Sequence, residues 1–504
     1  MIRDEANLLK LVRSLEVRTS LHAIWEIQRL AFDIGTKRSF LKNLPQGGLS
    51  AKISKRKNIY PWVIEHMANI ICCNGSDYQP GKTYLDNTDW KIWANFNNRL
   101  LSYNNNRSGL FLKNNHIFVT LSKIGHQQFP WQDGALGLTS MARFASIYCG
   151  PHCNANALKQ HNLNAEDFLA YGFILVSQFY QNPHMSLPYD LEIVGGDNKK
   201  LKAVLERFSI SSRNLRSKSR SLRKTDILGE YAKSILRKHP IIKFPDSTYF
   251  CPLPQLLIFR ITSGLISEIS GGAGQVRDEV GESFERYVQK ICESCFPKID
   301  LKPEENYGSR KAIQHTPDIR LYEDGLKIIL ECKATRINFR SKFELDSSED
   351  LPDRIEEISK GFVQIWKYIY DINIGKAPDK DYNSNIYGSV VTLDTWIQLD
   401  KDRHQRILEK ANKIADDKGL PADCRIKVIV SSIKDIEFVA QRSTFGQLCE
   451  CFKKAEDGKF SGYMLFNIFG ELFPDAELGN LIPNEEILSE RIWYWKEARK
   501  RAEF

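Results

Sequence analysis

The sequence lacks any long apolar segment that could serve as a signal peptide or a membrane span. Its N-terminus, MIRDEANLLKLVRSLEVRTS, is interrupted by charged residues every few positions. The most apolar stretch, FLAYGFILVSQFY at 168–180, contains Ser177 and Gln178 and is shorter than the ~20 residues that a helix needs to cross a bilayer. We therefore expect a cytoplasmic protein with no membrane partner.

Paired cysteine clusters and a phosphate-binding loop are also missing. The chain has 11 cysteines. A structural zinc ion needs four ligands, usually from two paired clusters, and no second pair follows Cys149 and Cys153 or Cys292 and Cys295. The glycine-bearing loop EISGGAGQVRD does not contain the GxxxxGK[ST] pattern. The sequence thus predicts reduced, buried thiols in place of a zinc site or a disulfide framework.

Acidic residues are scarce in two basic segments. Residues 35–60 hold seven cations and no acid, and among these cations are Lys55, Arg56 and Lys57. Residues 199–243 hold fourteen cations and three acids. The centre of the second segment, SISSRNLRSKSRSLRK, supplies Arg213, Arg216, Lys218, Arg220, Arg223 and Lys224. Cations in such runs suit the phosphate backbone of a nucleic acid, and the alternative is a solvated surface or linker.

The length and the order of predicted elements indicate several domains. At roughly 150 residues per domain, 504 residues predict two to four of them. A long amphipathic helix from Gln275 is followed by a hairpin, a helix, a strand, a helix and a strand, which favours an α/β fold with a central mixed β-sheet flanked by helices. We expect four regions: a mainly helical N-terminal domain of unknown role (1–195), a basic connector with a hairpin (196–270), the α/β domain (271–440) and a C-terminal helical extension (441–504).

The hairpin TPDIRLYEDGLKIILECKAT at 316–335 carries charged residues within apolar strands. Strand alternation places Glu331 and Lys333 on one face, about 6–7 Å apart along the strand. Folding the hairpin about its Asp-Gly turn sets Asp318 opposite Glu331. Facing carboxylates destabilise a sheet unless a positive charge lies between them.

These carboxylates predict a site for a hard divalent cation, Mg²⁺ or Mn²⁺. The alternative is a solvated face on which Lys333 neutralises exposed Asp318 and Glu331. The Pro-Asp start, the E-x-K spacing and the apolar residues before Glu331 favour the metal site.

The pattern Pro317-Asp318 followed by Glu331-Cys332-Lys333 resembles the PD-(D/E)xK nuclease superfamily, which has a restriction-endonuclease-like fold. This resemblance covers roughly residues 275–435. It implies that Asp318 and Glu331 ligate the metal and that Lys333 positions the attacking water.

Two flanking helices extend the resemblance. The segment GESFE at 281–285 is similar to an element of the superfamily's first helix, which implies that Glu285 completes the metal site, with Glu282 as a weaker candidate. Gln364 and Tyr368 are similar to a motif of the RecB-like branch, in which both residues approach the active site or the nucleic acid. That branch often holds an iron–sulfur cluster, but Cys292, Cys295, Cys449 and Cys451 do not follow its arrangement, so we predict none.

The sequence as a whole predicts a metal-dependent endonuclease that acts on DNA. A large N-terminal domain on such a nuclease resembles bacterial restriction and anti-phage effectors, in which the extra domain senses a trigger, docks a partner protein or forms a homo-oligomer. Two alternatives stay open. The first is a nuclease-fold subunit that binds nucleic acid or recruits a partner without cutting, and the second is a nuclease directed at RNA.

Overall fold

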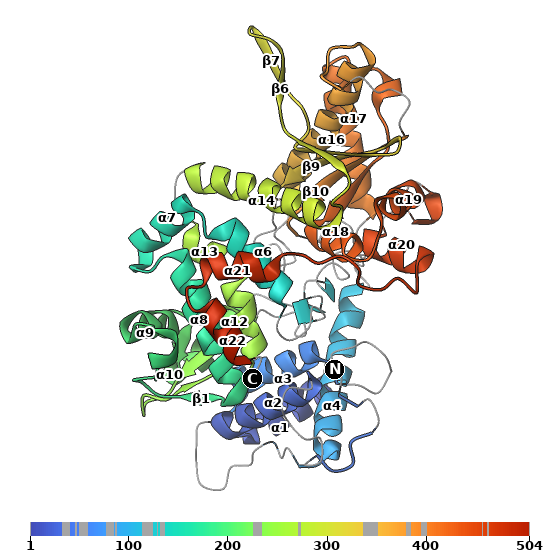
Figure 1. Ribbon diagram of the computed structural model, residues 1–504. Coiled ribbons are helices and arrows are strands. Elements are labelled where there is room, and N and C mark those ends of the chain that lie inside the picture. The colour runs from blue at the N-terminus through green and yellow to red at the C-terminus, as the bar shows by residue number, and fades with distance from the viewer. Residues whose placement is uncertain are drawn as a thin grey trace. The chain divides into compact units, whose positions relative to one another are not determined.

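The computed structural model shows a mixed α/β protein whose N-terminal region is helical (Figure 1). It describes residues 2–32, 41–45, 48–49, 59–76, 85, 88–112, 124–125, 127–128, 130–131, 137–224, 234–270, 274–335, 351–379, 385–394, 401–455, 457–460 and 463–502. Among these residues, no helix is both long and apolar enough to cross a membrane.

The chain forms two compact units, and each is described separately. Unit 1 contains Met1–Gly272 together with Leu488–Phe504, and unit 2 contains Ala273–Lys342 and Asp346–Ile487. The division after Gly272 lies next to the domain boundary predicted at residue 271. The segment 196–270, which we expected to be a connector, lies entirely inside unit 1.

Unit 1 is mainly helical, and its buried core combines apolar residues from the first 131 residues with others from 210–256. Asn164 caps the start of α8, because its side chain and that of Asp167 form a reciprocal capping box. A small sheet in the order β1-β4-β3-β2 completes the unit. The helices of unit 1 are α1 (Ile2–Ser14), α2 (Val17–Ala31), α3 (Pro61–Asn74), α4 (Trp90–Leu112), α6 (Leu138–Tyr148), α7 (Pro151–His161), α8 (Ala165–Gln181), α9 (Asn198–Arg207), α10 (Ser212–Lys224), α11 (Ile235–Lys238), α12 (Pro254–Ile261), α13 (Ile266–Ile269) and α22 (Trp495–Ala502), and its strands are β1 (His184–Met185), β2 (Ser209–Ser211), β3 (Ile241–Lys243) and β4 (Tyr249–Phe250).

The C-terminal end of the chain packs in unit 1, which corrects the prediction of one helical extension over 441–504. The Tyr494 hydroxyl donates to the carbonyl oxygen of Ala170 at 2.6 Å, and the rings of Trp495 and Phe173 lie 5.4 Å apart. Residues 441–487 belong to unit 2, where Asn480 donates to the carbonyl oxygen of Ala440 at 2.9 Å. The helical pattern could not reveal this division, because either unit can bury an amphipathic helix.

Unit 2 is built on a five-stranded mixed sheet in the order β11-β10-β9-β8-β5. β5 and β8 pair antiparallel, as do β8 and β9, while β10 lies parallel to both β9 and β11. A separate two-stranded ribbon, β6 and β7, lies between β5 and β8 in sequence. The strands are β5 (Asp300–Pro303), β6 (Asn306–Ser309), β7 (Ala312–His315), β8 (Ile319–Glu323), β9 (Leu326–Lys333), β10 (Asn385–Thr392) and β11 (Val428–Ser432).

Helices contact the central strand β9 and bury it. α14 presents Phe284, Val288 and Ile291 as a buried stripe, as its apolar spacing predicted. α16 and α17 share a second apolar core with Ile329 and Val390. The helices of unit 2 are α14 (Gly274–Cys295), α16 (Leu351–Asn373), α17 (Lys401–Asp417), α18 (Ile433–Ala440), α19 (Phe445–Ala455) and α20 (Leu465–Leu472), and α21 (Asn484–Arg491) continues into unit 1.

Candidate active site

The turn between β8 and β9 sets the register that brings the predicted carboxylates together. Asp324 and Gly325 have φ angles of 47° and 76°, the left-handed values that a tight Asp-Gly hairpin turn requires. Ile319 pairs with Leu330 at the far end of the ladder. One step further, Asp318 faces Glu331, so the predicted register is confirmed.

Glu331 is buried inside unit 2, with only 1% of its surface exposed. Lys333 Nζ donates to its Oε1 at 2.7 Å, and its Oε2 has no hydrogen-bond partner among the described residues. α16 comes close at Gly361, where an added Cβ would lie 3.3 Å from Glu331 Cγ and 2.9 Å from a methyl group of Val390. The alternative of a solvated hairpin face is wrong, because Glu331 lies in the interior.

Asp318 is partly exposed, and its Oδ2 accepts a hydrogen bond from the Cys332 backbone N–H at 2.5 Å. Burial, followed by repulsion from the carboxylates of Glu331 and Glu285, raises the pKa of Asp318 far above its ordinary range. Burial likewise raises the pKa of Glu331, although the Lys333 ammonium opposes that shift. Among the described residues, the site therefore holds more carboxylates than Lys333 alone can neutralise.

Glu285, on α14, belongs to the same carboxylate cluster. It is partly exposed, and its pKa is raised to about 7 by burial and then by Glu304 and Glu331. Glu282 differs, because its side chain is 66% exposed and pairs with Arg286 one turn along the helix. Glu285 thus interacts electrostatically with Asp318 and Glu331, whereas Glu282 lies on the surface.

Glu304 is a member of this cluster that the sequence did not reveal. It follows β5, its carboxylate lies 3.1 Å from His315 Nδ1, and its charge raises the pKa of both Glu285 and Glu331. The buried Arg320 holds the backbone around it, donating to the carbonyl oxygen of Pro303 at 2.8 Å and to Glu305 at 2.8 Å. The hint in the sequence is the acidic pair Glu304-Glu305, which lies about a dozen residues before the Pro-Asp motif.

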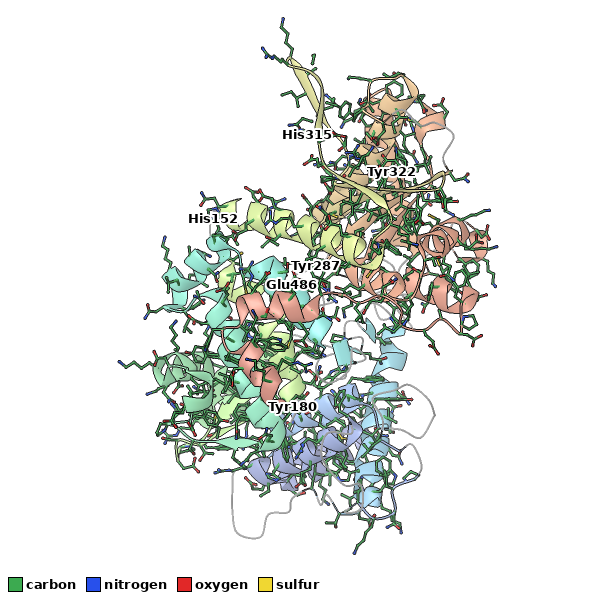
Figure 2. All side chains as sticks on the ribbon, in the orientation of Figure 1. His152, Tyr180, Tyr287, His315, Tyr322 and Glu486 are labelled. Atoms are coloured by element: carbon green, nitrogen blue, oxygen red, sulfur yellow. The ribbon has the colours of Figure 1, made fainter. Side chains whose placement is uncertain are left out.

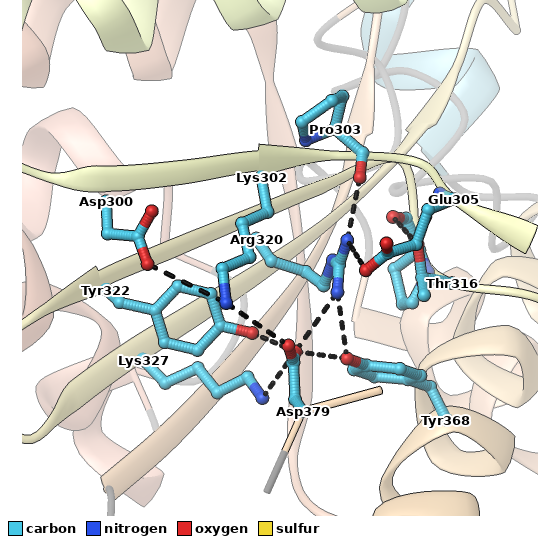
Figure 3. Close-up of polar contacts among 11 residues, drawn as sticks. Asp300, Lys302, Pro303, Glu305, Thr316, Arg320, Tyr322, Lys327, Tyr368 and Asp379 are labelled. Atoms are coloured by element: carbon cyan, nitrogen blue, oxygen red, sulfur yellow. Dashed lines mark hydrogen bonds and ion pairs between the residues drawn. The ribbon is translucent and has the colours of Figure 1, made fainter. Parts of the chain in front are cut away.

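Arg320 also belongs to a second ionic cluster centred on Asp379 (Figure 3). Arg320 donates to Asp379 at 3.1 Å, Lys327 lies 3.3 Å from it, and the Tyr322 hydroxyl donates to it. Burial alone would raise the pKa of Asp379, but these hydroxyl and cationic donors bring it well below its usual range. We call Asp379 and these donors the Asp379 cluster.

The two residues predicted on α16 separate in the structure. Tyr368 is 1% exposed, and its hydroxyl donates to Asp379 and accepts from Arg320 at 3.2 Å. Its predicted contact with nucleic acid is corrected, because its polar tip lies inside the Asp379 cluster. Gln364 is exposed one turn earlier, and among the described residues no hydrogen bond joins it to Asp318 or Glu331.

Two arginines of the basic helix α10 have a structural role. Arg216 donates to the carbonyl oxygen of Gly75 at 2.7 Å and Arg220 to that of Cys73 at 2.8 Å, so both satisfy the C-terminal end of α3. Arg213, Lys218 and Arg220 are exposed and Arg216 is partly exposed, so all four remain candidates for contact with nucleic acid. The side chains of Arg223 and Lys224, together with Lys55, Arg56 and Lys57, lie outside the described residues.

All eleven cysteines are free and buried. Burial raises the pKa of the Cys295 and Cys449 thiols to about 12, which favours the neutral thiol over the thiolate. In the described part of the chain, no three His, Cys, Asp or Glu side chains come close enough together to hold a metal ion.

Two carboxylates nevertheless fit a magnesium ion. Mg²⁺ keeps several waters and is commonly held by one or two carboxylates together with phosphate oxygens of the substrate. Asp318 and Glu331 supply that donor set, and the unpartnered Oε2 of Glu331 leaves a lone pair for it. Comparison with known proteins adds nothing to this geometry, since no family model, curated protein or solved structure matches the chain.

Proposed function

We propose that this protein is a metal-dependent nuclease that hydrolyses phosphodiester bonds, with DNA as its substrate. One observation carries the proposal: Asp318, directly before β8, comes opposite Glu331 of β9 when the register is extended by one residue. Among the described residues, the buried Glu331 has one oxygen without a hydrogen-bond partner, and Lys333 is the cation that pairs with it. An excess of buried carboxylate is costly unless a cation joins it. Asp318 and Glu331 would hold Mg²⁺ or Mn²⁺, with Glu285 assisting.

The chemistry required is hydrolysis of one P–O ester bond. The hydroxide of a water molecule adds to phosphorus, the bond from phosphorus to the leaving oxygen breaks, and that oxygen takes up the remaining proton of the water. A bound Mg²⁺ would supply charge stabilisation at the phosphoryl oxygens and a lower pKa for its water. Lys333 Nζ, fixed by Glu331 at 2.7 Å, provides a cation that can orient that water or stabilise the charge that develops on the phosphate.

The order of elements supports the restriction-endonuclease-like interpretation of unit 2. α14, the β8–β9 hairpin, α16 and β10 occur in this order along the chain as helix, hairpin, helix and strand, with β5 and the β6–β7 ribbon between α14 and the hairpin. That order is the one that the PD-(D/E)xK resemblance implies. In this proposal unit 1 is the sensing or partner-docking part of a defence nuclease, an analogy of architecture and not of chemistry.

The test compares wild type with Asp318→Ala and Lys333→Ala on plasmid, linear duplex, single-stranded DNA and RNA, each with Mg²⁺, Mn²⁺ or EDTA. Wild type should cut DNA with metal and not with EDTA, and each variant should lose at least a hundredfold in rate, the typical cost of one missing electrostatic contact. Asp475→Ala and Lys376→Ala alter exposed charges elsewhere in unit 2 and serve as matched controls. Cutting that survives EDTA or persists in Asp318→Ala contradicts the proposal.

A second candidate is a nuclease-fold subunit that binds nucleic acid without cutting it. The observation in its favour is that, in the part of the chain described by the structure, three metal-ligating side chains are not grouped. This candidate predicts binding in EDTA that is equal for wild type and Lys333→Ala, with no cleavage under any metal. Cleavage of RNA alone would instead identify a ribonuclease.

A further inference from the structure

The ribbon formed by β6 and β7 is built differently from the rest of unit 2. Its strands pair antiparallel, from Asn306 opposite His315 to Ser309 opposite Ala312, and Arg310 and Lys311 form the turn. Figure 1 shows this ribbon extending away from the five-stranded sheet. Every residue from 308 to 313 is exposed, and Ile313 has 57% of its surface exposed.

An isolated two-stranded hairpin is marginally stable in water, so its base must hold it. The Tyr307 hydroxyl donates to Asp371 of α16 at 2.6 Å. Below the strands, the Thr316 N–H donates to the carbonyl oxygen of Glu305 at 3.0 Å, and Arg320 binds the Glu305 carboxylate. These hydrogen bonds hold the base of the ribbon against unit 2, while its tip is exposed.

The base of the ribbon adjoins the candidate active site. His315, the last residue of β7, lies near that base (Figure 2) and pairs with Glu304 of the carboxylate cluster. Asp318 follows only three residues later. A molecule held along the ribbon is thereby brought to Asp318 and Glu331.

The composition of the ribbon selects the class of partner. Residues 306–315, NYGSRKAIQH, contain Arg310, Lys311 and His315 but no acidic residue. Asn306, Ser309 and Gln314 add hydrogen-bonding groups. Two cations at the tip, in a ribbon whose sequence has no acidic residue, complement a phosphate backbone, in contrast to the acidic site at the base.

The shape of the ribbon favours a duplex over a single strand. A two-stranded β-ribbon fits the major groove of B-form DNA, which is about 12 Å wide and about 8.5 Å deep. Four residues per strand reach about 13 Å, enough to enter that groove. Proteins that hold single strands stack bases on aromatic rings, and the one aromatic residue of the ribbon, Tyr307, is partly buried and bonded to Asp371.

The backbone of the ribbon requires glycine at position 308. Its φ of 90° lies in the left-handed region, and an added Cβ would stand 2.7 Å from the carbonyl oxygen of Ala312. Any side chain at 308 would thus distort the pairing with β7.

We infer that the β6–β7 ribbon binds duplex DNA, with Arg310 and Lys311 contacting phosphates, and delivers the strand to the neighbouring carboxylate site. This inference deepens the proposed function and rests on it for the fate of the DNA. Binding by the ribbon itself requires no cleavage. The A-form major groove of double-stranded RNA is too narrow for the ribbon.

The test measures binding in EDTA by fluorescence anisotropy, using the full chain and labelled duplex DNA, single-stranded DNA and duplex RNA of equal length. Arg310→Ala/Lys311→Ala should weaken duplex DNA binding about five- to tenfold. The slope of log K against log salt should fall by about two, because each lost phosphate contact removes close to one. The control Lys453→Ala/Lys454→Ala removes an adjacent cation pair from α19 and should bind as wild type.

Unchanged duplex affinity in a folded Arg310→Ala/Lys311→Ala protein overturns the inference, and so does an equal loss on single strands or on duplex RNA. Arg310→Glu/Lys311→Glu should weaken binding further, and circular dichroism confirms that each variant is folded. If wild type never cuts DNA but the ribbon variants still lose duplex binding, the nuclease proposal fails and the ribbon inference stands. If wild type cuts and the variants bind normally, only the ribbon inference fails.

Discussion

Two ionic groups occupy opposite ends of the same strands of unit 2, and they differ in charge balance. The Asp379 cluster offers one central carboxylate to Arg320, Lys327 and the hydroxyls of Tyr322 and Tyr368, so the pKa of Asp379 is lowered. At the other end, Asp318 and Glu331 share one lysine, and both of their pKa values are raised. A buried carboxylate that is paired with cations and hydrogen-bond donors is satisfied within the fold. A group that holds more carboxylates than cations is instead a candidate site for a bound metal cation.

The largest effect on stability should come from removing the carboxylate at the centre of the balanced cluster. Among the described residues, Asp379→Asn leaves buried Lys327 without a counter-ion and Arg320 with Glu305 alone, which should lower the free energy of unfolding by about 3–5 kcal/mol. Urea unfolding followed by circular dichroism measures the change. Asp300→Asn, at an exposed partner of Lys302, is the control and should alter stability by less than about 0.5 kcal/mol.

The same type of substitution in the unbalanced group should have the opposite sign. Asp318→Asn relieves the repulsion with Glu331 and should stabilise the metal-free protein by about 1 kcal/mol, the equivalent of nearly one pKa unit. Mg²⁺ at a hundred times its dissociation constant should stabilise wild type by about 2.7 kcal/mol, and the variant should lose this response. Thermal unfolding with Mg²⁺ and with EDTA tests both statements, and a destabilised Asp318→Asn would remove the contrast between the two groups.

The smallest effect should appear as a dependence of stability on pH in EDTA. The pKa of Glu285 rises from 4.5 to about 7 on folding, so the folded chain binds this proton more tightly than the unfolded chain. Its contribution is therefore fully present below about pH 4.5 and is lost as the pH rises through about 7. Asp318 shifts in the same direction, while Asp379 has the opposite sign and loses its contribution as the pH falls.

Glu285→Gln should flatten the decline in stability between pH 5 and pH 8, because glutamine has no proton to lose. Melting temperatures over this range for wild type, Glu285→Gln and the surface control Glu282→Gln provide the comparison. If the curves of wild type and Glu285→Gln run parallel, the pKa of Glu285 is not raised by burial and by the other carboxylates of the cluster.

The parts of the site that follow from local chemistry could be predicted from the sequence. The Asp-Gly turn fixes the register of β8 and β9, and strand alternation puts Glu331 and Lys333 on one face. Residues that meet only through tertiary packing could not be found in this way. Glu304, Arg320 and Asp379 belong to segments that carry no motif, and Asp379 is far from the other two in sequence. Their contacts form only when the sheet folds.

The ribbon and the basic helix show two further limits of sequence interpretation. NYGSRKAIQH has no apolar alternation, because neither face of β6 and β7 is buried, so the usual signal for a strand is missing. On α10, charge alone could not show that Arg216 and Arg220 donate to carbonyl oxygens at the end of α3. Counting charged residues gives the net charge of a segment, but the group that each cation contacts depends on the fold.

The return of residues 488–504 to unit 1 has a topological consequence. Unit 2 is an inserted domain, since the chain enters it after Gly272 and leaves it after Ile487. Cutting the chain at either junction alone leaves the inserted domain covalently attached to part of its host. A truncation after Ile487 trims unit 1 by removing α22, and the fragment that isolates the carboxylate site runs from Ala273 to Ile487.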